Sequence, residues 1–173
     1  METDDVGLIR AEVQPATPIE VGRAMGSAEP GEVIWTTHAI PIIIADSVVN
    51  LLSAHGFTGW SLYPVAVRNK QGKTVPGYSG LAVTGRCGNI EFSKSVQVPR
   101  IFPAGVSPVL KGFLFDPASW DGSDFFMPVR RSGHVFVVEE VKKAFEKAKI
   151  RNVSFEALDQ VESSILQLQM SEK

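Results

Sequence analysis

The chain has 173 residues, of which 44% are hydrophobic and 21% are charged, and its formal net charge is −2. This composition is typical of a globular protein with a buried core and excludes a fibrous or disordered chain. The longest uninterrupted apolar run covers only residues 39–45, whereas a membrane-spanning helix needs about 20 residues. The first residues, METDD, are acidic where a secretory signal carries basic charge. The sequence therefore predicts a soluble, cytoplasmic protein that neither crosses nor binds a membrane.

Charge is distributed unevenly along the chain. Residues 1–50 carry eight acidic and two basic side chains, residues 51–115 carry one and seven, and residues 116–173 carry ten and eight. This pattern is compatible with solvated faces that compensate one another, or with a charged docking surface. Seven basic residues spread over the middle stretch, without paired aromatic platforms, do not predict a nucleic-acid groove.

The first 65 residues divide into an irregular segment and a strand–helix–strand unit. Proline and glycine recur through residues 1–40, so only short strands such as 32–36 are expected there. Residues 41–65 predict a buried strand at 42–44, a helix at 46–55 and a second strand. Asp46 or Ser47 is expected to cap this helix, and Gly56 to end it with a left-handed residue.

The middle of the chain is rich in expected strands. Apolar residues alternate from Trp60 to Val67, and further short strands are expected at 81–84 and 90–92. Residues 69–72, Asn-Lys-Gln-Gly, indicate a turn. Prolines and glycines in residues 99–112 predict a loop.

Residues 134–158 repeat the pattern of residues 41–65 at an offset of 93 residues, with apolar positions matching apolar positions. The second copy predicts a strand at 135–138, a helix at 139–149 and a short strand that includes Val153 and Phe155. Apolar residues spaced by three and four then predict an amphipathic C-terminal helix over 159–171. The expected fold is one α+β domain spanning 1–173, mostly antiparallel, with the two strand–helix–strand units and the terminal helix.

Motifs that carry chemistry are weak in this sequence. Gly72-Lys73-Thr74 ends like a phosphate-binding loop, but Val67 stands where that loop needs its first glycine, so a hairpin turn is the better interpretation. The single cysteine, Cys87, excludes an intramolecular disulfide and a cysteine zinc cluster. No two histidines have the helical spacing of a metal pair, so neither a metal nor another cofactor is predicted. A nucleophilic role for Cys87 would need a histidine base, for which the candidates are His38, His55 and His134.

Tyr63, Pro64, Val65, Val67, Asn69 and Gly72 follow the pattern YPV-V-(D/N)-x-x-G. This pattern resembles the strand and turn of a bacterial immunity-protein family that was first defined on a myxobacterial protein and is associated with polymorphic toxin systems. The family's (L/V)-x-V-x-G-R strand is matched by residues 81–86, and its (D/E)-x-x-(K/R)-S segment by Glu91, Lys94 and Ser95. The resemblance covers about residues 42–158, because Phe125 and the run 135–140 resemble the family's closing strand–helix–strand. The chain lacks the paired Cys-x-x-Cys of a related group, which argues against a zinc-knuckle version.

The resemblance implies a protein that is not an enzyme and that neutralises a cognate toxin domain. A 1:1 complex that blocks the toxin's active site or substrate groove would need shape and charge complementarity but no catalytic residue. Two other classes stay open on the residues alone. One is a small hydrolase or transferase that uses Cys87 with a histidine, and the other is a scaffold subunit that assembles through its C-terminal helix, a route that would also allow a homo-oligomer.

One loop combines an aromatic side chain with charges of both signs. Its candidate partner-binding residues are Trp120, Asp121, Asp124, Arg130 and Arg131. Tryptophan and arginine are the side chains that most often dominate a protein interface. The alternative is that Trp120 covers the core while the acidic residues lie in a solvated loop.

Overall fold

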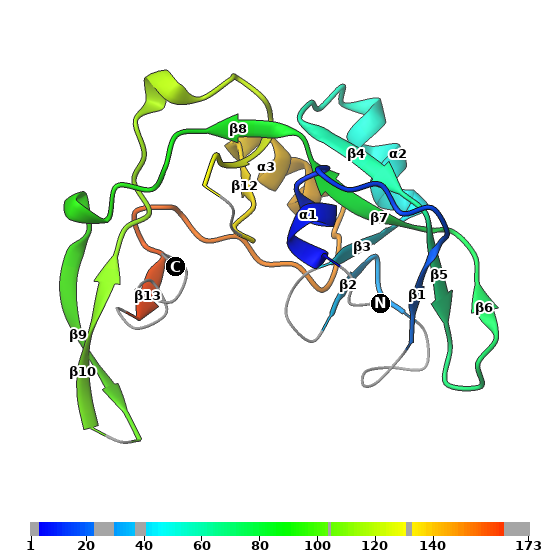
Figure 1. The fold of residues 1–173 in the computed structure, drawn as a ribbon, viewed down its shortest axis with the longest axis horizontal. Helices are drawn as coiled ribbons and strands as arrows, with labels where there is room; N and C mark the ends of the chain where they lie inside the picture. The colour runs from blue at the N-terminus through cyan, green and yellow to red at the C-terminus, as the bar shows by residue number, and fades with distance from the viewer. Residues whose placement is uncertain (1–3, 23–29, 37–40, 104, 131–132, 165–173) are drawn as a thin grey trace. The chain divides into compact units, whose positions relative to one another are not determined.

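The computed structural model describes residues 4–22, 30–36, 41–103, 105–130 and 133–164 (Figure 1). The chain divides into two compact units. Unit 1 comprises residues 1–86, 121–127 and 133–153, and unit 2 comprises residues 87–120, 128–132 and 154–173. The predicted α+β class with mostly antiparallel sheets is confirmed. That all 173 residues form one domain stays a prediction.

Among the described residues, unit 1 contains the α-helices and most of the strands. Its helices are α1 (Asp5–Ile9), α2 (Asp46–Ala54) and α3 (Glu139–Lys147). Its strands are β1 (Ile19–Val21), β2 (Val33–Trp35), β3 (Ile42–Ala45), β4 (Trp60–Tyr63), β5 (Val65–Arg68), β6 (Thr74–Val75), β7 (Tyr78–Val83), β8 (Gly85–Cys87), β11 (Phe125–Pro128) and β12 (Phe136–Val137), of which β8 and β11 each end with a residue of unit 2.

The strands of unit 1 form a four-stranded sheet in the order β2-β3-β7-β4 and three-stranded sheets in the orders β1-β5-β6 and β12-β11-β8. Only β1 and β5 are paired in parallel among the pairings described. The apolar run Ile42–Ile44 is buried along its whole length, so both faces of β3 are covered. Gly80 of β7 lies opposite both Ile43 and Tyr63, and a Cβ there would come within 2.1 Å of the Tyr63 ring.

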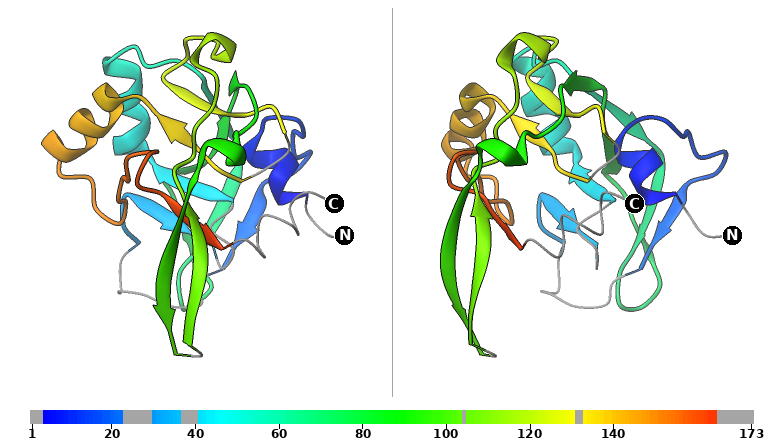
Figure 2. Two further views of the ribbon diagram at one scale, coloured as in Figure 1. Left: turned by 90° about the vertical axis from the view of Figure 1, so that its left-hand side faces the viewer. Right: turned by 60° about the vertical axis from the view of Figure 1, so that its left-hand side comes forward.

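Unit 2 is built on a long hairpin. It contains β9 (Val96–Phe102), β10 (Gly105–Lys111), β13 (Glu162–Ser164) and the short 3-10 helices η1 (Phe92–Lys94) and η2 (Pro117–Ser119). The strand order is β13-β10-β9, with both pairings antiparallel. At the base of the hairpin the buried Phe113 packs edge-to-face on Phe92, with 5.8 Å between ring centroids. Figure 2 shows β9 and β10 from two further directions as one twisted ribbon.

The helices confirm the 93-residue offset, because α2 and α3 begin and end 93 residues apart. Val48 and Val141 are equivalent and both fully buried. Equivalence extends to the preceding hairpins, in which Ile34 pairs with Ile43 and Phe126 pairs with Phe136. The repeated unit is therefore a hairpin followed by a helix.

Both helices also end in the same way. Gly56 and Lys149 take positive φ values of 68° and 54°. The next amide then reaches back to the last helical turn, from Phe57 to Leu52 (3.1 Å) and from Ile150 to Phe145 (3.0 Å). This 6→1 hydrogen bond is the Schellman motif, which satisfies carbonyls that a helix end leaves unpaired. The left-handed residue predicted at Gly56 is confirmed, and Lys149 repeats it.

The two copies differ after the helix. In the first copy the chain continues into β4, which pairs with β7. The strand predicted around Val153 and Phe155 is not formed. There the Asn152 side chain donates to the Val33 carbonyl of β2 at 2.7 Å, and Asn152 itself takes a φ of 67°. The positive φ is not the cause, because the equivalent Gly59 has a φ of 82° and is followed directly by β4. The difference is that β4 pairs with β7, whereas residues 153–155 form no strand pairing.

Four further predictions were wrong. The strand expected at 90–92 is not formed, and Phe92 instead begins the 3-10 helix η1. Residues 99–112, predicted as a loop, form most of β9 and β10. Residues 162–164 form β13 instead of the start of the C-terminal helix predicted over 159–171, whose remainder from 165 lies outside the described residues. The cap of α2 is Ala45, with no side-chain hydrogen bond, so neither Asp46 nor Ser47 fills that role. Residues 1–40 also contain a helix, α1, that was not predicted.

In the part of the chain that the structure describes, no helix combines the length and apolar content that a membrane crossing requires.

Candidate functional site

The five predicted partner-binding residues do not all have the same setting. Trp120 is half-buried at the end of η2 and Arg130 is exposed, and both belong to unit 2. Asp121 and Asp124 belong to unit 1. Arg131 lies outside the described residues. Their joint role in partner binding stays a prediction.

Asp121 is engaged in hydrogen bonds within its own unit. Its carboxylate accepts from the backbone amide of Arg86 at 2.7 Å. It also accepts from the amide and the hydroxyl of Ser123, at 3.0 and 2.6 Å. Partial burial acts to raise the pKa of Asp121, but these hydrogen bonds outweigh it and the pKa is lowered. A substitution at Asp121 would therefore disturb the fold as well as any interface.

Asp124 fastens one repeat to the other. Its carboxylate accepts from the amide and the hydroxyl of Thr58, at 2.7 and 2.9 Å, in the turn that follows α2. Its own carbonyl accepts from Val138 at 3.0 Å, directly before α3. Asp124 thus links the helix end of the first copy to the helix start of the second.

Glu32 makes the reciprocal link. Its carboxylate accepts from the Arg151 amide at 3.3 Å, in the turn that follows α3, and also from the Arg151 guanidinium. Its carbonyl accepts from Ala45 at 2.8 Å, directly before α2. Glu32 precedes β2 as Asp124 precedes β11, so the two copies hold each other through equivalent acids. Both acids therefore have a structural role that the sequence pattern did not indicate.

The Glu32 link predicts a pH dependence of stability. The guanidinium of Arg151 donates to Glu32 and lowers its pKa, so the folded protein holds this carboxylate ionised more strongly than the unfolded chain does. The stabilisation is fully present above the ordinary glutamate pKa of about 4.3 and is lost as the pH falls below it. We expect the Tm of the wild type to fall more steeply below about pH 4.5 than that of Glu32→Gln. Thermal unfolding followed by circular dichroism measures this, and equal slopes would contradict it.

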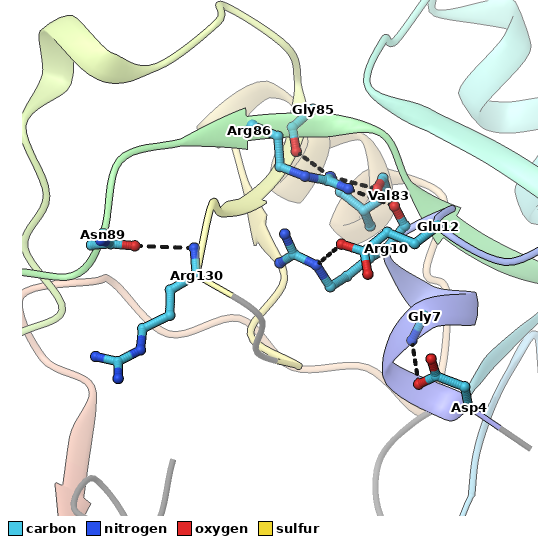
Figure 3. Close-up of polar contacts among 9 residues, drawn as sticks. All are labelled: Asp4, Gly7, Arg10, Glu12, Val83, Gly85, Arg86, Asn89 and Arg130. Atoms are coloured by element: carbon cyan, nitrogen blue, oxygen red, sulfur yellow. Dashed lines mark hydrogen bonds and ion pairs between the residues drawn. The ribbon is translucent and has the colours of Figure 1, made fainter. Parts of the chain in front are cut away.

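Arg86 is a second structural centre of unit 1 (Figure 3). Its guanidinium donates to the carbonyls of Val83 (2.7 Å), Gly85 (2.8 Å) and Arg10. Arg10 is itself buried and forms an ion pair with Glu12 at 2.6 Å. Burial, and then the neighbouring charge of Arg10, lower the pKa of Arg86. The guanidinium ties the end of α1 to β7 and β8.

Cys87 would be the nucleophile of the alternative enzymatic site. It lies at the end of β8, and its side chain is 0% exposed. His55 stacks on Phe57 with 5.2 Å between ring centroids, and His134 lies before β12. His38 lies outside the described residues. In the ranges described, no three His, Cys, Asp or Glu side chains are grouped so that they could hold a metal ion.

The residues that carry the family resemblance have clear structural roles. Tyr63, Val65 and Val67 lie on β4 and β5, where Tyr63 and Val67 are buried. Asn69 accepts from the amides of Gln71 (3.0 Å) and Lys73 (2.9 Å), forming the turn between β5 and β6. These residues form strands and a turn, so they do not by themselves mark a binding surface.

Exposed apolar side chains are concentrated on the strands β9 and β10 of unit 2, which we call the ribbon (residues 96–102 and 105–111). Every described residue from 99 to 108 is exposed. Near its tip Ile101 is 88% exposed, Val106 67% and Phe102 43%. Ile101 and Val106 are directly opposite each other in the hairpin register, and adjoining exposed apolar side chains are typical of a surface that contacts a partner. The ribbon is therefore the candidate binding site that the structure adds.

The two faces of the ribbon differ in charge. Side chains alternate between faces along each strand. One face carries Arg100, Lys111 and, on β13, Glu162, and Arg100 forms an ion pair with Glu162. The other face carries no charged residue: its side chains are Gln97, Pro99, Ile101, Val106, Pro108, Leu110 and, on β13, Ser163.

The ribbon was missed because its prolines and glycine were taken as loop signals. Pro99 and Pro108 are directly opposite each other in the hairpin register. Neither can donate a backbone hydrogen bond, so this position must be a non-hydrogen-bonded pair, at which antiparallel strands tolerate proline. The signal that could have found the hairpin is the apolar alternation on either side, Val96 and Val98 before the prolines and Val109 after them.

No protein-family model matches this sequence, and no curated protein is significantly similar to it.

Proposed function

We propose that this chain is an immunity protein that binds and neutralises a cognate bacterial toxin domain in the cytoplasm, in a 1:1 complex that blocks the toxin's active site or substrate groove. The proposal rests on binding and needs no catalytic residue or cofactor in this chain. The function then depends on surface residues that contact the toxin.

The observation that carries the proposal is the exposed apolar tip of the ribbon. Ile101 and Val106 face each other across the hairpin, and both are largely exposed. Keeping two such side chains in water forgoes about 1.5–3 kcal/mol each relative to full burial. A partner that covers them recovers this free energy, whereas the chain alone does not.

The resemblance to the immunity family supports the choice of a toxin as partner, through the strand and turn motif from Tyr63 to Gly72 and the strand at 81–86. The Trp120–Arg130 part of the predicted loop remains a second candidate contact. Because Asp121 and Asp124 hold backbone amides, substitutions there would not separate binding from folding. Trp120→Ala and Arg130→Ala are the informative variants of that loop.

Co-expression with the toxin encoded beside this chain's gene tests the function. We expect cells to survive when the toxin is expressed with this protein and to die when it is expressed alone. Purified toxin should also lose its activity at a 1:1 molar ratio. A gene neighbourhood without a toxin domain, or cell death despite a folded wild-type protein, would contradict the proposal.

A further inference from the structure

We infer that the ribbon inserts into a concave cleft of the toxin, with its uncharged face against an apolar wall of that cleft. This inference rests on the proposed function and names the element that blocks the toxin. Three conditions follow from it. The ribbon must dock through its side chains and not through its backbone edge, and its partner must not be a second copy of this chain. The face that the partner covers must be the uncharged one.

The backbone edge of the ribbon is poorly suited to strand addition. β9 is the edge strand of the sheet β13-β10-β9. At non-hydrogen-bonded positions the backbone groups point away from the neighbouring strand, and Pro99 occupies such a position. An added strand would find no amide donor there, and proline on an edge strand is a known way of blocking edge-to-edge pairing. Pro99 thus disfavours strand addition in the middle of the exposed edge, and we assign the docking to side chains.

The face with Ile101 and Val106 is the one that can be covered at the lower cost. Burying a charge without a partner is costly, and the opposite face already carries Arg100 and Glu162. From the facing pair Gln97 and Leu110 toward the tip, the described side chains of the uncharged face include no charge that burial would leave unpaired. Ile101 and Val106 are also a non-hydrogen-bonded pair by alternation from the proline pair, so their side chains lie close together. They form one apolar surface.

A second copy of the ribbon is too small a partner. Four pairs of facing residues are exposed, beginning with Pro99 opposite Pro108 and ending with Phe102 opposite Gly105. At about 3.4 Å per residue along each strand and about 5 Å between strands, each face of this segment has an area on the order of 150 Å². A standard interface buries about 800 Å² per partner. Stacking two ribbons face to face therefore covers only a small part of what a stable dimer needs.

A cleft provides the missing contact area, because it covers the uncharged face of the narrow ribbon together with the exposed side chains along its edge. Every described residue of the segment 99–108 is exposed and is available for such contacts. Substrate sites of enzymes are concave and mostly apolar, with a few polar groups. The ribbon has the narrow shape, and its uncharged face has the lack of charge, that fit this kind of site.

The test compares two sets of substitutions in the full-length protein. Ile101→Asp with Val106→Asp places two charges on the uncharged face, and we expect the Kd for the purified neighbouring toxin to rise at least about 100-fold. Val13→Asp is the matched control, since Val13 is 40% exposed and lies outside the ribbon. We expect its Kd to stay within about 3-fold of wild type. Calorimetry gives both values, and circular dichroism shows that each variant is folded.

Inhibition kinetics and sedimentation complete the test. We expect the wild type to inhibit the toxin competitively with its substrate, and the free wild type to sediment as a monomer. Toxin binding that survives the double substitution would overturn the insertion and leave the proposed function standing. Non-competitive inhibition would overturn the insertion and also the blocking of the active site, and would leave only neutralisation by binding. A wild-type dimer that the double substitution dissociates, with toxin binding unchanged, would assign the ribbon to a second copy. Failure of the wild type to bind the toxin would overturn both the function and the insertion.

Discussion

Gly59→Ala is expected to destabilise the protein by about 2–5 kcal/mol, which sums the strain of a left-handed alanine and the cost of overpacking. Gly59 has a φ of 82°, and a Cβ at this position would lie 2.1 Å from the Phe125 carbonyl oxygen. That oxygen belongs to the backbone of β11, so it cannot move aside as a flexible side chain would. The free energy of unfolding from urea titration measures the effect.

Gly56→Ala is the matched control for this prediction. Gly56 also has a positive φ, 68°, but a Cβ there would meet no atom within 4 Å. Its expected cost is only the strain of about 1 kcal/mol. Equal losses for Gly56→Ala and Gly59→Ala would show that the approach of β11 to the turn after α2 does not limit stability.

Gly56 and Gly59 both belong to the repeated unit, so the two substitutions can also be compared with the second copy. Gly56 corresponds to Lys149 and Gly59 to Asn152, and all four residues have positive φ. In the first copy both positions are glycine, and Thr58 lies between these glycines in the sequence. The Phe125 amide donates to the Thr58 carbonyl, and the Thr58 amide donates to the Asp124 carboxylate. The second copy uses a lysine and an asparagine, whose side chain then holds the edge of β2. The same backbone turn thus joins the helix to different neighbours.

The parts of the fold that the sequence predicts are those set by local patterns. α2 and α3 follow from apolar residues that recur at helical spacing, and the offset between them is visible as matched apolar positions. Gly56 ends α2 as predicted, because a left-handed helix terminus favours glycine. The β4 strand after it was also predicted, whereas the equivalent strand after α3 was not formed.

The links between distant segments could not be predicted from local patterns. Glu32 meets Arg151, and Asp124 meets Thr58, across large separations in the chain, and no periodicity records such pairs. Asp124 was predicted as a partner contact because its loop combines Trp120 with charges of both signs. The ribbon was missed for a different reason, since Pro99 and Pro108 look like breaks until their register places them opposite each other.

Replacing Arg86 is expected to have the second large effect on stability. Its guanidinium donates to three backbone carbonyls, of Val83, Gly85 and Arg10, and a lysine ammonium on a flexible stem cannot match this planar arrangement. Hydrogen bonds that involve a charged group contribute about 1.5–3 kcal/mol each, and part of this is recovered by water, so we expect Arg86→Lys to cost about 2–4 kcal/mol.

The loss should be concentrated at α1, because Arg86 reaches the end of that helix through the Arg10 carbonyl. We therefore expect the amides of α1 to exchange with solvent faster in Arg86→Lys than in the wild type, beyond the change seen in α3. Arg68→Lys is the matched control, since Arg68 is exposed and pairs with Glu20 at the surface, where ion pairs contribute little. If α1 kept its protection in Arg86→Lys, or if both substitutions changed stability equally, the three carbonyl contacts would not be what holds α1 against β7 and β8.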